Sequence, residues 1–357
     1  MHLFKNTFSD NQSNPYGIEC LQGQKVLDTR PLWEEVFSED SKAFTDYYYT
    51  RKAPGNTTFI CRHLPTGQIV SMVHLTPYEM TLHGISLPTF YIVGVATREN
   101  FRHKGIMSTL LDRAFDYAAG LHCPFIFLMP ADPAIYEPFG FSYIYSRPQY
   151  AVPENLSPKE VYINSFSASE IRVQALEKET SLHTLNALAD FASHTLSAQY
   201  DYYLTRTPSY YRTLLLELYA QNGCIYTFTL HNRLEGYFLY AEEEKSPFIQ
   251  ELLFSNKLYS HIASMHYVNH SELLPALPTN SQFSRNSIMS TMFPTLLPES
   301  KPIIMAKNLL PAASDSATSH SEISAASIPA SSSDMPLRIQ DYVNYLSTHK
   351  GFINEIV

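Results

Sequence analysis

The turn RHKGIM, Arg102 to Met107, has the residue types that hold a phosphate group. Gly105 lets the backbone approach a ligand closely, and three basic side chains precede it. A helix is predicted to begin at about Gly105, and the amides at a helix N-terminus carry a partial positive charge that favours anions. The turn therefore suits a pyrophosphate, although the same residues are also typical of an ordinary basic helix start. The P-loop and dinucleotide-binding glycine patterns are both absent from the sequence.

Two apolar segments flank this turn and its helix. Thr89 to Thr97 (TFYIVGVAT) and Pro124 to Met129 (PFIFLM) have the β-branched and aromatic content of buried strands. Between them, apolar residues recur at helical spacing from Gly105 to Ala119, and Gly120 follows as a stop signal. A strand–turn–helix–strand order predicts a crossover unit whose two strands are parallel.

The last residues, GFINEIV, are more apolar than a frayed terminus would need. They follow a Ser/Ala-rich stretch, residues 311–335, whose composition is typical of a flexible linker. An amphipathic segment, Leu337 to Tyr345, lies between the linker and this end. The pattern indicates that the C-terminal segment is held in place.

Composition limits the classes of protein that fit. At 357 residues, with 45% apolar and 13% aromatic residues, the chain predicts a globular protein of two or three domains. A net charge of −9 argues against nucleic-acid binding. No apolar run approaches the roughly 20 residues of a membrane span, and the first residues lack a secretory signal pattern. The four cysteines lack CxxC spacing, which favours reduced core thiols in a cytoplasmic protein over a metal or redox site.

The chain divides by pattern into three regions. Residues 1–150 alternate strands and helices, and a proline-rich stretch from Arg147 to Glu160 predicts a boundary. Residues 151–300 begin with a long helical pattern, Ala175 to Ala198. Both regions contain a strand–turn–strand pair, at Thr57–Leu75 and at Cys224–Glu243, which indicates a duplicated domain. Residues 301–357 hold a strand, the linker, a helix and the terminal segment.

The stretch VGVATRENFRHKGIMSTLL, followed by FLMPADPAIYEPFGF, resembles the GNAT N-acetyltransferases, in particular the enhanced-intracellular-survival type. The resemblance implies an α/β fold of tandem acetyltransferase domains with mixed sheets flanked by helices. It also implies a shortened sterol-carrier-like C-terminal region, of which PIIMAKN resembles the opening strand. Met107 departs from the usual Gly or Ala of the acetyl-CoA motif. The second domain has no counterpart of that motif, so we expect it to have a structural role.

The resemblance assigns the acetyl-CoA contacts. It implies that backbone groups of Val95, Ala96 and Thr97 pair with the pantetheine arm as an added strand. It implies that the pyrophosphate binds at the turn, and that Ala131 and Asp132 flank the pantetheine and acetyl groups. The residues of the turn are Arg102, His103, Lys104, Gly105, Ile106, Met107 and Ser108.

Two residues are implied to act on protons. Tyr136, in AIYEPFGF, falls on the family's catalytic tyrosine, which assists departure of the CoA thiolate. An amine with a pKa near 10.4 must lose a proton before it attacks, so a base is useful. The family uses its C-terminal carboxylate for this step, which here is that of Val357, with Glu355 or water as the alternatives.

The amine pocket is expected within Pro31 to Tyr49. Aromatic and acidic residues occur together there and could line a wall and attract a cation, although a solvated amphipathic helix pair fits the pattern better. The residues considered are Trp33, Phe37, Tyr47, Glu34, Glu35, Glu39 and Asp40.

These observations predict a cytoplasmic enzyme that transfers an acetyl group directly from acetyl-CoA to a primary amine of a small molecule or peptide. No metal, nucleic acid or membrane is expected, and a homo-oligomer is possible. The alternatives are a non-catalytic acyl-CoA-binding sensor or interaction module, and a lipid carrier built on the C-terminal region. The sequence leaves the amine open.

Overall fold

The computed structural model describes residues 14–151, 170–243, 246–258, 260–261, 299–309 and 342–353. The chain forms two compact units, which interleave along the sequence. Unit 1 comprises Met1–Tyr145, Tyr200–Thr205 and Pro302–Val357, and unit 2 comprises Ser146–Gln199 and Arg206–Lys301. The described part of the C-terminal region is therefore built into unit 1. The predicted boundaries at residues 150 and 300 stay a prediction, and the predicted linker lies outside the described residues.

Unit 1 is built on a mixed sheet of strand order β1-β2-β3-β4-β5-β12. Neighbouring strands are antiparallel, except that β4 and β5 are parallel, as the crossover pattern predicts. The strand that was compared with a sterol-carrier domain is β12, which pairs with β5. The strands are β1 (Tyr16–Gln22), β2 (Thr57–His63), β3 (Gln68–Leu82), β4 (Ile85–Thr97), β5 (Phe125–Leu128) and β12 (Glu299–Asn308).

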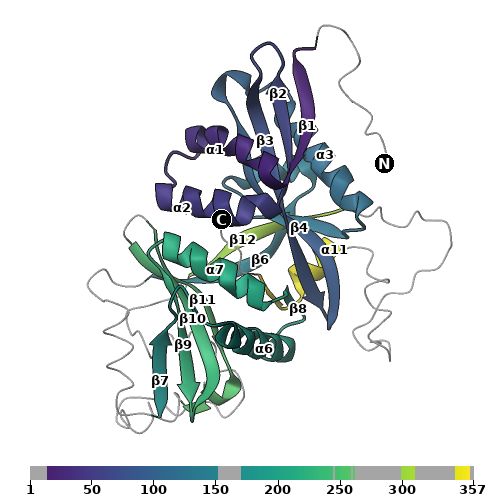
Figure 1. Ribbon diagram of the computed structural model, residues 1–357. Helices are drawn as coiled ribbons and strands as arrows, with labels where there is room; N and C mark the ends of the chain where they lie inside the picture. The colour runs from purple at the N-terminus through teal and green to yellow at the C-terminus, as the bar shows by residue number, and fades with distance from the viewer. Residues whose placement is uncertain are drawn as a thin grey trace, which may run out of the picture. The chain divides into compact units, whose positions relative to one another are not determined.

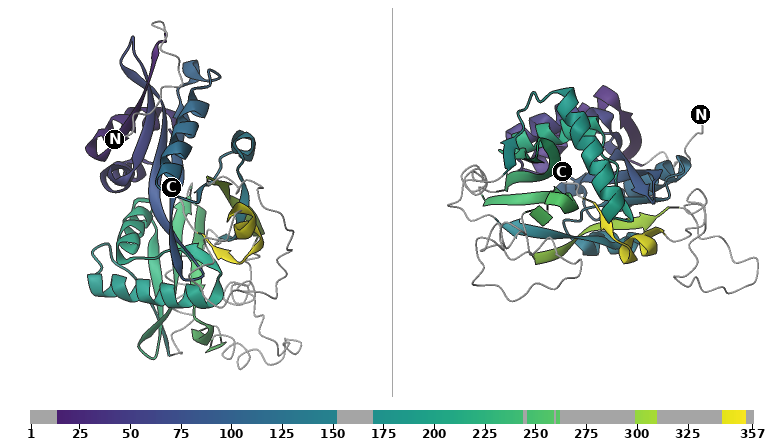
Figure 2. Two further views of the ribbon diagram at one scale, coloured as in Figure 1. Left: turned by 90° about the vertical axis from the view of Figure 1, so that its right-hand side faces the viewer. Right: turned by 90° about the horizontal axis from the view of Figure 1, so that it is seen from below.

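Helices cover both faces of this sheet (Figures 1 and 2). Helix α3 (Ile106–Gly120) lies on one face, and its apolar side chains form a core with inward-facing residues of β2 to β5. Helices α1 (Arg30–Val36) and α2 (Lys42–Tyr47) lie on the other face. The short helical turns η1 (Gly23–Thr29), η2 (Tyr48–Lys52) and η3 (Ala53–Gly55) continue that second layer.

The remaining elements of unit 1 are short. Helix α4 (Pro133–Tyr136) and the turn η5 (Glu137–Phe139) follow β5, and β6 (Ser142–Ala151) comes next. Strand β8 (Tyr202–Leu204) pairs with the end of β3, and β13 (Gly351–Phe352) pairs with β8. Helix α11 (Tyr342–Thr348) precedes β13.

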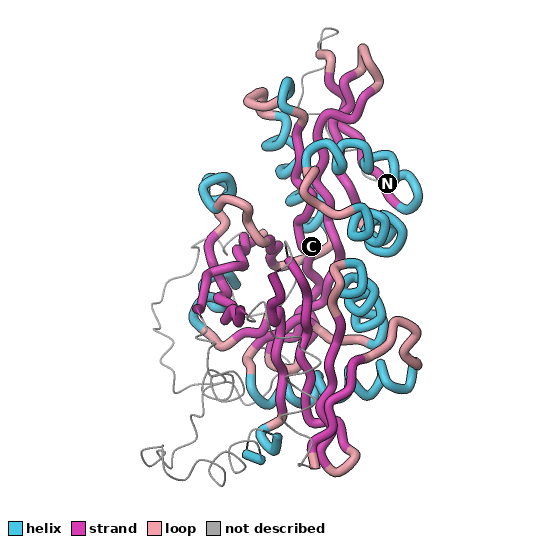
Figure 3. Tube along the Cα trace, turned by 90° about the vertical axis from the view of Figure 1, so that its left-hand side faces the viewer, coloured by secondary structure: helices cyan, strands magenta, loops and turns pink. Residues whose placement is uncertain are grey.

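Unit 2 has an antiparallel sheet of strand order β6-β11-β10-β9-β7, in which the C-terminal end of β6 pairs with β11. Helices α6 (Leu182–Gln199) and α7 (Pro208–Ala220) cover one face of it, as the helix and strand colouring in Figure 3 also shows. The helix that was predicted to begin at Ala175 begins at Leu182 instead. Ala175 is the last residue of β7 (Ile171–Ala175), which pairs with β9. The other strands are β9 (Cys224–Leu230), β10 (Arg233–Glu243) and β11 (Ser246–Phe254).

The cysteines differ in their surroundings. Cys61 and Cys123 are buried in unit 1, as expected for core thiols, and burial raises the pKa of each to about 11. Cys20 is exposed, so its predicted core position is wrong, because its place on edge strand β1 leaves that side chain in solvent. Within the described ranges, no helix has both the length and the apolar character that a membrane crossing requires.

Candidate functional site

Strand β4 contains a bulge at Gly94 and Val95. Met72 of β3 pairs with Ala96, and His74 pairs with Val93. Between these two pairs β3 has one residue and β4 has two, so β4 carries the extra residue of a β-bulge. Gly94 has φ +59°, a left-handed conformation that glycine adopts without steric cost. A glycine inside an otherwise apolar strand is the sequence signal that could have predicted this bulge.

Beyond the bulge, β4 separates from β5. The two strands pair only at Tyr91 with Phe127 and at Ile92 with Leu128. We call residues 93–97 of β4 the splayed segment, because β5 ends at Leu128 and is not paired with it in the described structure. A parallel strand that loses its neighbour leaves backbone N–H and C=O groups without a strand partner along that edge. The predicted contacts Val95, Ala96 and Thr97 all lie in this segment.

The predicted anion site lies at the start of helix α3. Gly105 is the N-cap residue with φ +73°, and its neighbour but one, His103, has φ +60°. No side chain caps this helix end, so the first amides, those of Ile106, Met107 and Ser108, are left for solvent or a ligand. A 15-residue helix with an uncapped N-terminus favours an anion there.

Two basic side chains of the turn already have partners. Arg102 Nε donates to the Thr97 carbonyl over 3.1 Å, which joins the turn to the splayed segment. Lys104 Nζ donates to the Asn100 carbonyl over 3.0 Å and lies over the Phe101 ring. Both side chains remain exposed, so each can add positive charge beside the helix end.

Tyr136 lies in helix α4, just after β5. Its side chain is buried in the core on the α3 face, in the cluster that includes Ile106 and Leu128 and that Val95 packs against. Burial raises the pKa of Tyr136 to about 12. The structure therefore brings the predicted tyrosine, the first residue of α3 and the splayed segment into one cluster.

The predicted Ala131 and Asp132 lie between β5 and α4. The Asp132 carboxylate accepts the amide of Ala134 over 2.9 Å and caps helix α4. Asp132 thereby sets the start of the helix that carries Tyr136. Both Ala131 and Asp132 are exposed, and Ala131 follows the last paired residues of β5 by three positions.

The expected amine pocket is largely closed. Trp33 and Tyr47 are buried, and the Trp33 ring packs against Phe37 and Tyr48 with centroid distances of 4.8 and 4.4 Å. The expectation that these rings line an open wall is wrong for Trp33 and Tyr47, because the aromatic side chains of this layer pack on one another. They form the core on the second face of the sheet.

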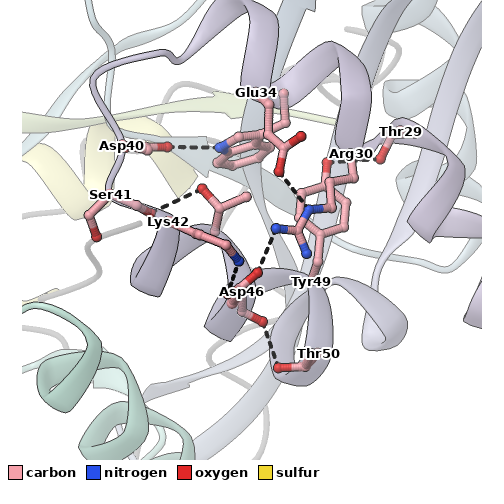
Figure 4. A network of polar contacts seen from close by, with 11 residues as sticks. Thr29, Arg30, Glu34, Asp40, Ser41, Lys42, Asp46, Tyr49 and Thr50 are labelled. Atoms are coloured by element: carbon pink, nitrogen blue, oxygen red, sulfur yellow. Dashed lines mark hydrogen bonds and ion pairs between the residues drawn. The ribbon is translucent and has the colours of Figure 1, made fainter.

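Three of the four acidic residues considered for this pocket have protein partners. Glu34 pairs with Arg30 over 2.7 Å, and Glu35 pairs with Arg98. Asp40 accepts the indole N–H of Trp33 over 2.7 Å, and burial raises the pKa of its carboxyl group. Figure 4 shows how Arg30 also reaches Asp46. The first two carboxylates are neutralised by arginine, and the third holds the tryptophan.

One buried histidine, His74, lies between this aromatic layer and the sheet and contacts two hydroxyl groups. His74 is fully buried, and its Nδ1 and Nε2 atoms lie 3.2 Å from the hydroxyls of Tyr48 and Thr29. Burial lowers the pKa of His74 to about 3, so the ring is neutral at physiological pH. A single histidine in an apolar strand gave no functional signal in the sequence, and its position was not predicted.

The predicted base, the carboxylate of Val357, and its competitor Glu355 both lie outside the described residues, which end at residue 353. Just before the undescribed residues, Phe352 and Ile353 are buried, and Gly351 and Phe352 form β13. Among the residues that the structure describes, no group of three or more histidine, cysteine or acidic side chains could hold a metal ion.

Part of the chain matches a known protein family. Residues 19–144 match the family model for the acetyltransferase (GNAT) domain. None of the curated proteins matches the chain. The family model extends from β1 to the start of β6 and includes the splayed segment, the turn and Tyr136. It supports an N-acetyltransferase enzyme, since the family's domain coincides with the elements that form the candidate site.

Solved structures share the fold over a longer stretch. A protein of Enterococcus faecalis, described as of unknown function and a probable N-acyltransferase, superposes with a TM-score of 0.59 at 13% identity over 83% of this chain and 73% of its own. A GCN5-related N-acetyltransferase of Anabaena variabilis gives 0.56 at 10% identity, over 82% and 73%. Eis1 of Mycobacterium abscessus gives 0.53 at 14% identity, over 82% and 73%. At these identities the likeness shows the fold, a mixed α/β architecture that extends over both units.

Proposed function

We propose that this protein is an acetyl-CoA-dependent N-acetyltransferase of the enhanced-intracellular-survival type that acetylates a primary amine directly. One observation carries the proposal: the splayed segment of β4 ends beside the uncapped N-terminus of α3, joined to it by the bond from Arg102 to the Thr97 carbonyl. A molecule with an amide-containing arm and a pyrophosphate fits both features at once. The arm would add to the strand edge that β5 leaves unpaired, and the pyrophosphate would lie on the first amides of α3.

The reaction would proceed by direct attack on the thioester. The amine lone pair forms a bond to the carbonyl carbon, the carbon–sulfur bond breaks, and its electron pair stays on the CoA sulfur. Tyr136 donates a hydrogen bond to that sulfur. With a tyrosine pKa of about 12 against about 8.5 for a thiol, full proton transfer is uphill by roughly 5 kcal/mol, so the hydroxyl stabilises the thiolate by hydrogen bonding.

The amine also loses a proton as the amide forms. We assign this proton to the carboxylate of Val357, with Glu355 or water as the competing acceptors. The buried Phe352 and Ile353 support this assignment, because they anchor the chain four residues before Val357. A cytoplasmic location and a homo-oligomeric state are proposed from the sequence alone.

The decisive experiment measures release of free CoA thiol from acetyl-CoA with a panel of amines: aminoglycosides, polyamines, lysine peptides and peptides with free N-termini. We expect turnover with at least one amine, and loss of that turnover in Tyr136→Phe. Calorimetry on the same protein measures acetyl-CoA binding separately. Tight binding without thiol release for every amine would instead identify an acyl-CoA-binding module.

A further inference from the structure

Lys307 is a charged residue on the core-facing side of strand β12. It pairs with Ile126 of β5, and two residues earlier Met305 pairs with Leu128. Ile126, Leu128 and Met305 all belong to the core cluster on the α3 face. Paired residues of neighbouring strands point to the same face, and so do residues two apart along one strand, so Lys307 faces this core as well. Its side chain is partly buried there.

The ammonium group of Lys307 is bonded to the turn that follows Tyr136. Its Nζ atom donates to the carbonyl of Phe139, the last residue of η5, over 2.7 Å. The same atom lies 5.1 Å from the centre of the Phe115 ring of α3, within the range of a cation–π interaction. A methyl group at Gly140 would lie 3.4 Å from it. The lysine therefore joins β12, α3 and the end of η5.

The turn held by Lys307 is in contact with the ring of Tyr136. Phe139 and Phe141 pack on Phe115 with centroid distances of 6.5 and 5.9 Å. Phe141 packs edge to face on Tyr136 at 5.9 Å, and its amide donates to the Tyr136 carbonyl over 3.4 Å. A shift of the Phe139 carbonyl would therefore displace the tyrosine, both through the chain and through the Phe141 ring.

Helix α4 depends on contacts at its two ends. It has 4 residues, too few for a helix that is stable by itself in water. The Asp132 carboxylate caps its start, and the turn η5 that continues it ends at the carbonyl bonded by Lys307. Residues 133–139 are thus held at one end by an acidic side chain and at the other by a basic one. Tyr136 lies between these two anchors.

We propose that Lys307 is a positioning residue for acetyl transfer: it holds η5 so that the Tyr136 hydroxyl stays where it can donate to the departing CoA sulfur. The inference rests on the proposed function, in which Tyr136 stabilises the thiolate. It adds that a lysine of the C-terminal region, 168 residues beyond the carbonyl that it bonds, determines the placement of that hydroxyl. A hydrogen bond weakens steeply when it is misdirected, so a small displacement of the donor lowers the rate.

The main test replaces Lys307 by methionine, which keeps an unbranched stem and removes both the charge and the donor. We expect Lys307→Met to lower kcat at pH 7 by about tenfold and to leave the acetyl-CoA Kd unchanged, because the edge of β4 and the start of α3 stay in place. Thiol release measures kcat, and calorimetry measures the Kd. Lys307→Arg should recover most of the loss, since it keeps the charge and a donor. Lys307 borders a cavity of about 450 Å³, which leaves room for the longer side chain.

The dependence on Tyr136 separates positioning from stability. If Lys307 acts through the tyrosine hydroxyl, Lys307→Met should have no further effect on kcat in a Tyr136→Phe protein. Its cost in the free energy of unfolding, measured with urea, should be the same in both backgrounds. The matched control is Lys257→Met, the same change at a lysine of unit 2 that pairs with Glu235, and it should keep native kcat.

Carbon NMR of tyrosines labelled at Cζ follows the position of Tyr136 without turnover. Its resonance is assigned by its absence in Tyr136→Phe. The resonance should shift in Lys307→Met, return toward its native position in Lys307→Arg and stay in place in Lys257→Met.

The outcomes distinguish this inference from the function on which it rests. Native kcat in Lys307→Met, an unmoved Tyr136 resonance in that variant, or equal losses of kcat in the native and Tyr136→Phe backgrounds would each overturn the positioning role alone. Native turnover in Tyr136→Phe would remove the tyrosine from the proposed mechanism, and the role of Lys307 with it. Absence of thiol release from the native protein with every amine would overturn the proposed function and this inference together.

Discussion

The indole ring of Trp33 lies directly on the backbone of Gly94, so close that a methyl group at Gly94 would come within 2.5 Å of Cζ3. Trp33 is in turn held by the carboxylate of Asp40. The helical layer thus packs against β4 at the bulge itself. The shape of the strand edge proposed to bind the pantetheine arm therefore depends on the side chains on the opposite face of the sheet.

Gly94→Ala should destabilise the protein by about 2–4 kcal/mol, because it combines strain at φ +59° with overpacking against Trp33. Urea unfolding measures the free energy. Gly84→Ala is the matched control, since Gly84 has φ +80° and open space around it, and should cost only about 1 kcal/mol. Equal losses in the two variants would show that the Trp33 contact adds nothing.

Gly105→Val should weaken acetyl-CoA binding by at least about tenfold, because a branched side chain crowds the proposed pyrophosphate site and strains a residue at φ +73°. Calorimetry measures the Kd. Gly67→Val isolates the strain, because Gly67 has φ +71°, open space around it and a place in the β2–β3 turn. Unchanged affinity in a folded Gly105→Val protein would move the anion site elsewhere.

Tyr136→Phe should lower kcat by about 10²- to 10³-fold and leave the acetyl-CoA Kd unchanged, since it removes one donor aimed at the developing thiolate. With its pKa raised to about 12, Tyr136 should stay protonated and active up to at least pH 10. Steady-state kinetics from pH 7 to 10 tests both statements. Tyr143→Phe, a change to a partly buried neighbour, should keep native activity, and the role of Tyr136 is refuted if both variants behave alike.

Amidation of the Val357 carboxylate should lower kcat at pH 7 by about 10²-fold or more, because it removes the proposed base while keeping every side chain. Semisynthesis of the last residues gives the amide, and thiol release measures its turnover. The matched semisynthetic acid is the control, and Glu355→Gln should retain activity. Native turnover of the amide would assign the proton to Glu355 or to water.

His74 should make stability depend on pH in acid. Its pKa is about 3 when folded and about 6.5 when unfolded, so between these values the unfolded chain binds a proton that the folded chain does not. Stability should therefore fall as pH decreases through this range, by up to about 1.4 kcal/mol per pH unit from this group.

His74→Gln should remove that part of the slope, as urea unfolding at pH 7, 5.5 and 4 would show. His194→Gln, the same substitution at an exposed histidine in α6, is the control. An identical slope in His74→Gln and the native protein would mean that His74 is solvated in the folded state.

The elements around the anion site follow from the sequence because their determinants are local. The periodicity of apolar residues in 106–120 and the glycine at 105 specify α3 and its start, and the apolar runs on either side specify β4 and β5. Their parallel pairing follows from the handedness and length of a crossover connection. The hairpin of β2 and β3 follows equally from two short strand-like runs and the turn at Pro65 to Gly67 between them.

Other features could not be predicted because they depend on contacts between distant residues. The aromatic residues near Trp33 have the same spacing whether they line an open pocket or fill a core, and only the approach of Gly94 decided for a core. The helical pattern from Ala175 was wrong at its start, because Ala175 itself pairs with β9 as the last residue of β7 and α6 begins only at Leu182.

The pairing of the C-terminal strand β13 with β8 belongs to the same class. The sequence determined that apolar residues near Phe352 would be buried somewhere, since burying such side chains is favourable wherever the chain can reach. Only the tertiary structure decided where. The Tyr202 hydroxyl donates to the Leu346 carbonyl, 144 residues away, and β8 belongs to unit 1 although the segments on either side of it belong to unit 2. No local pattern encodes a contact between segments so far apart.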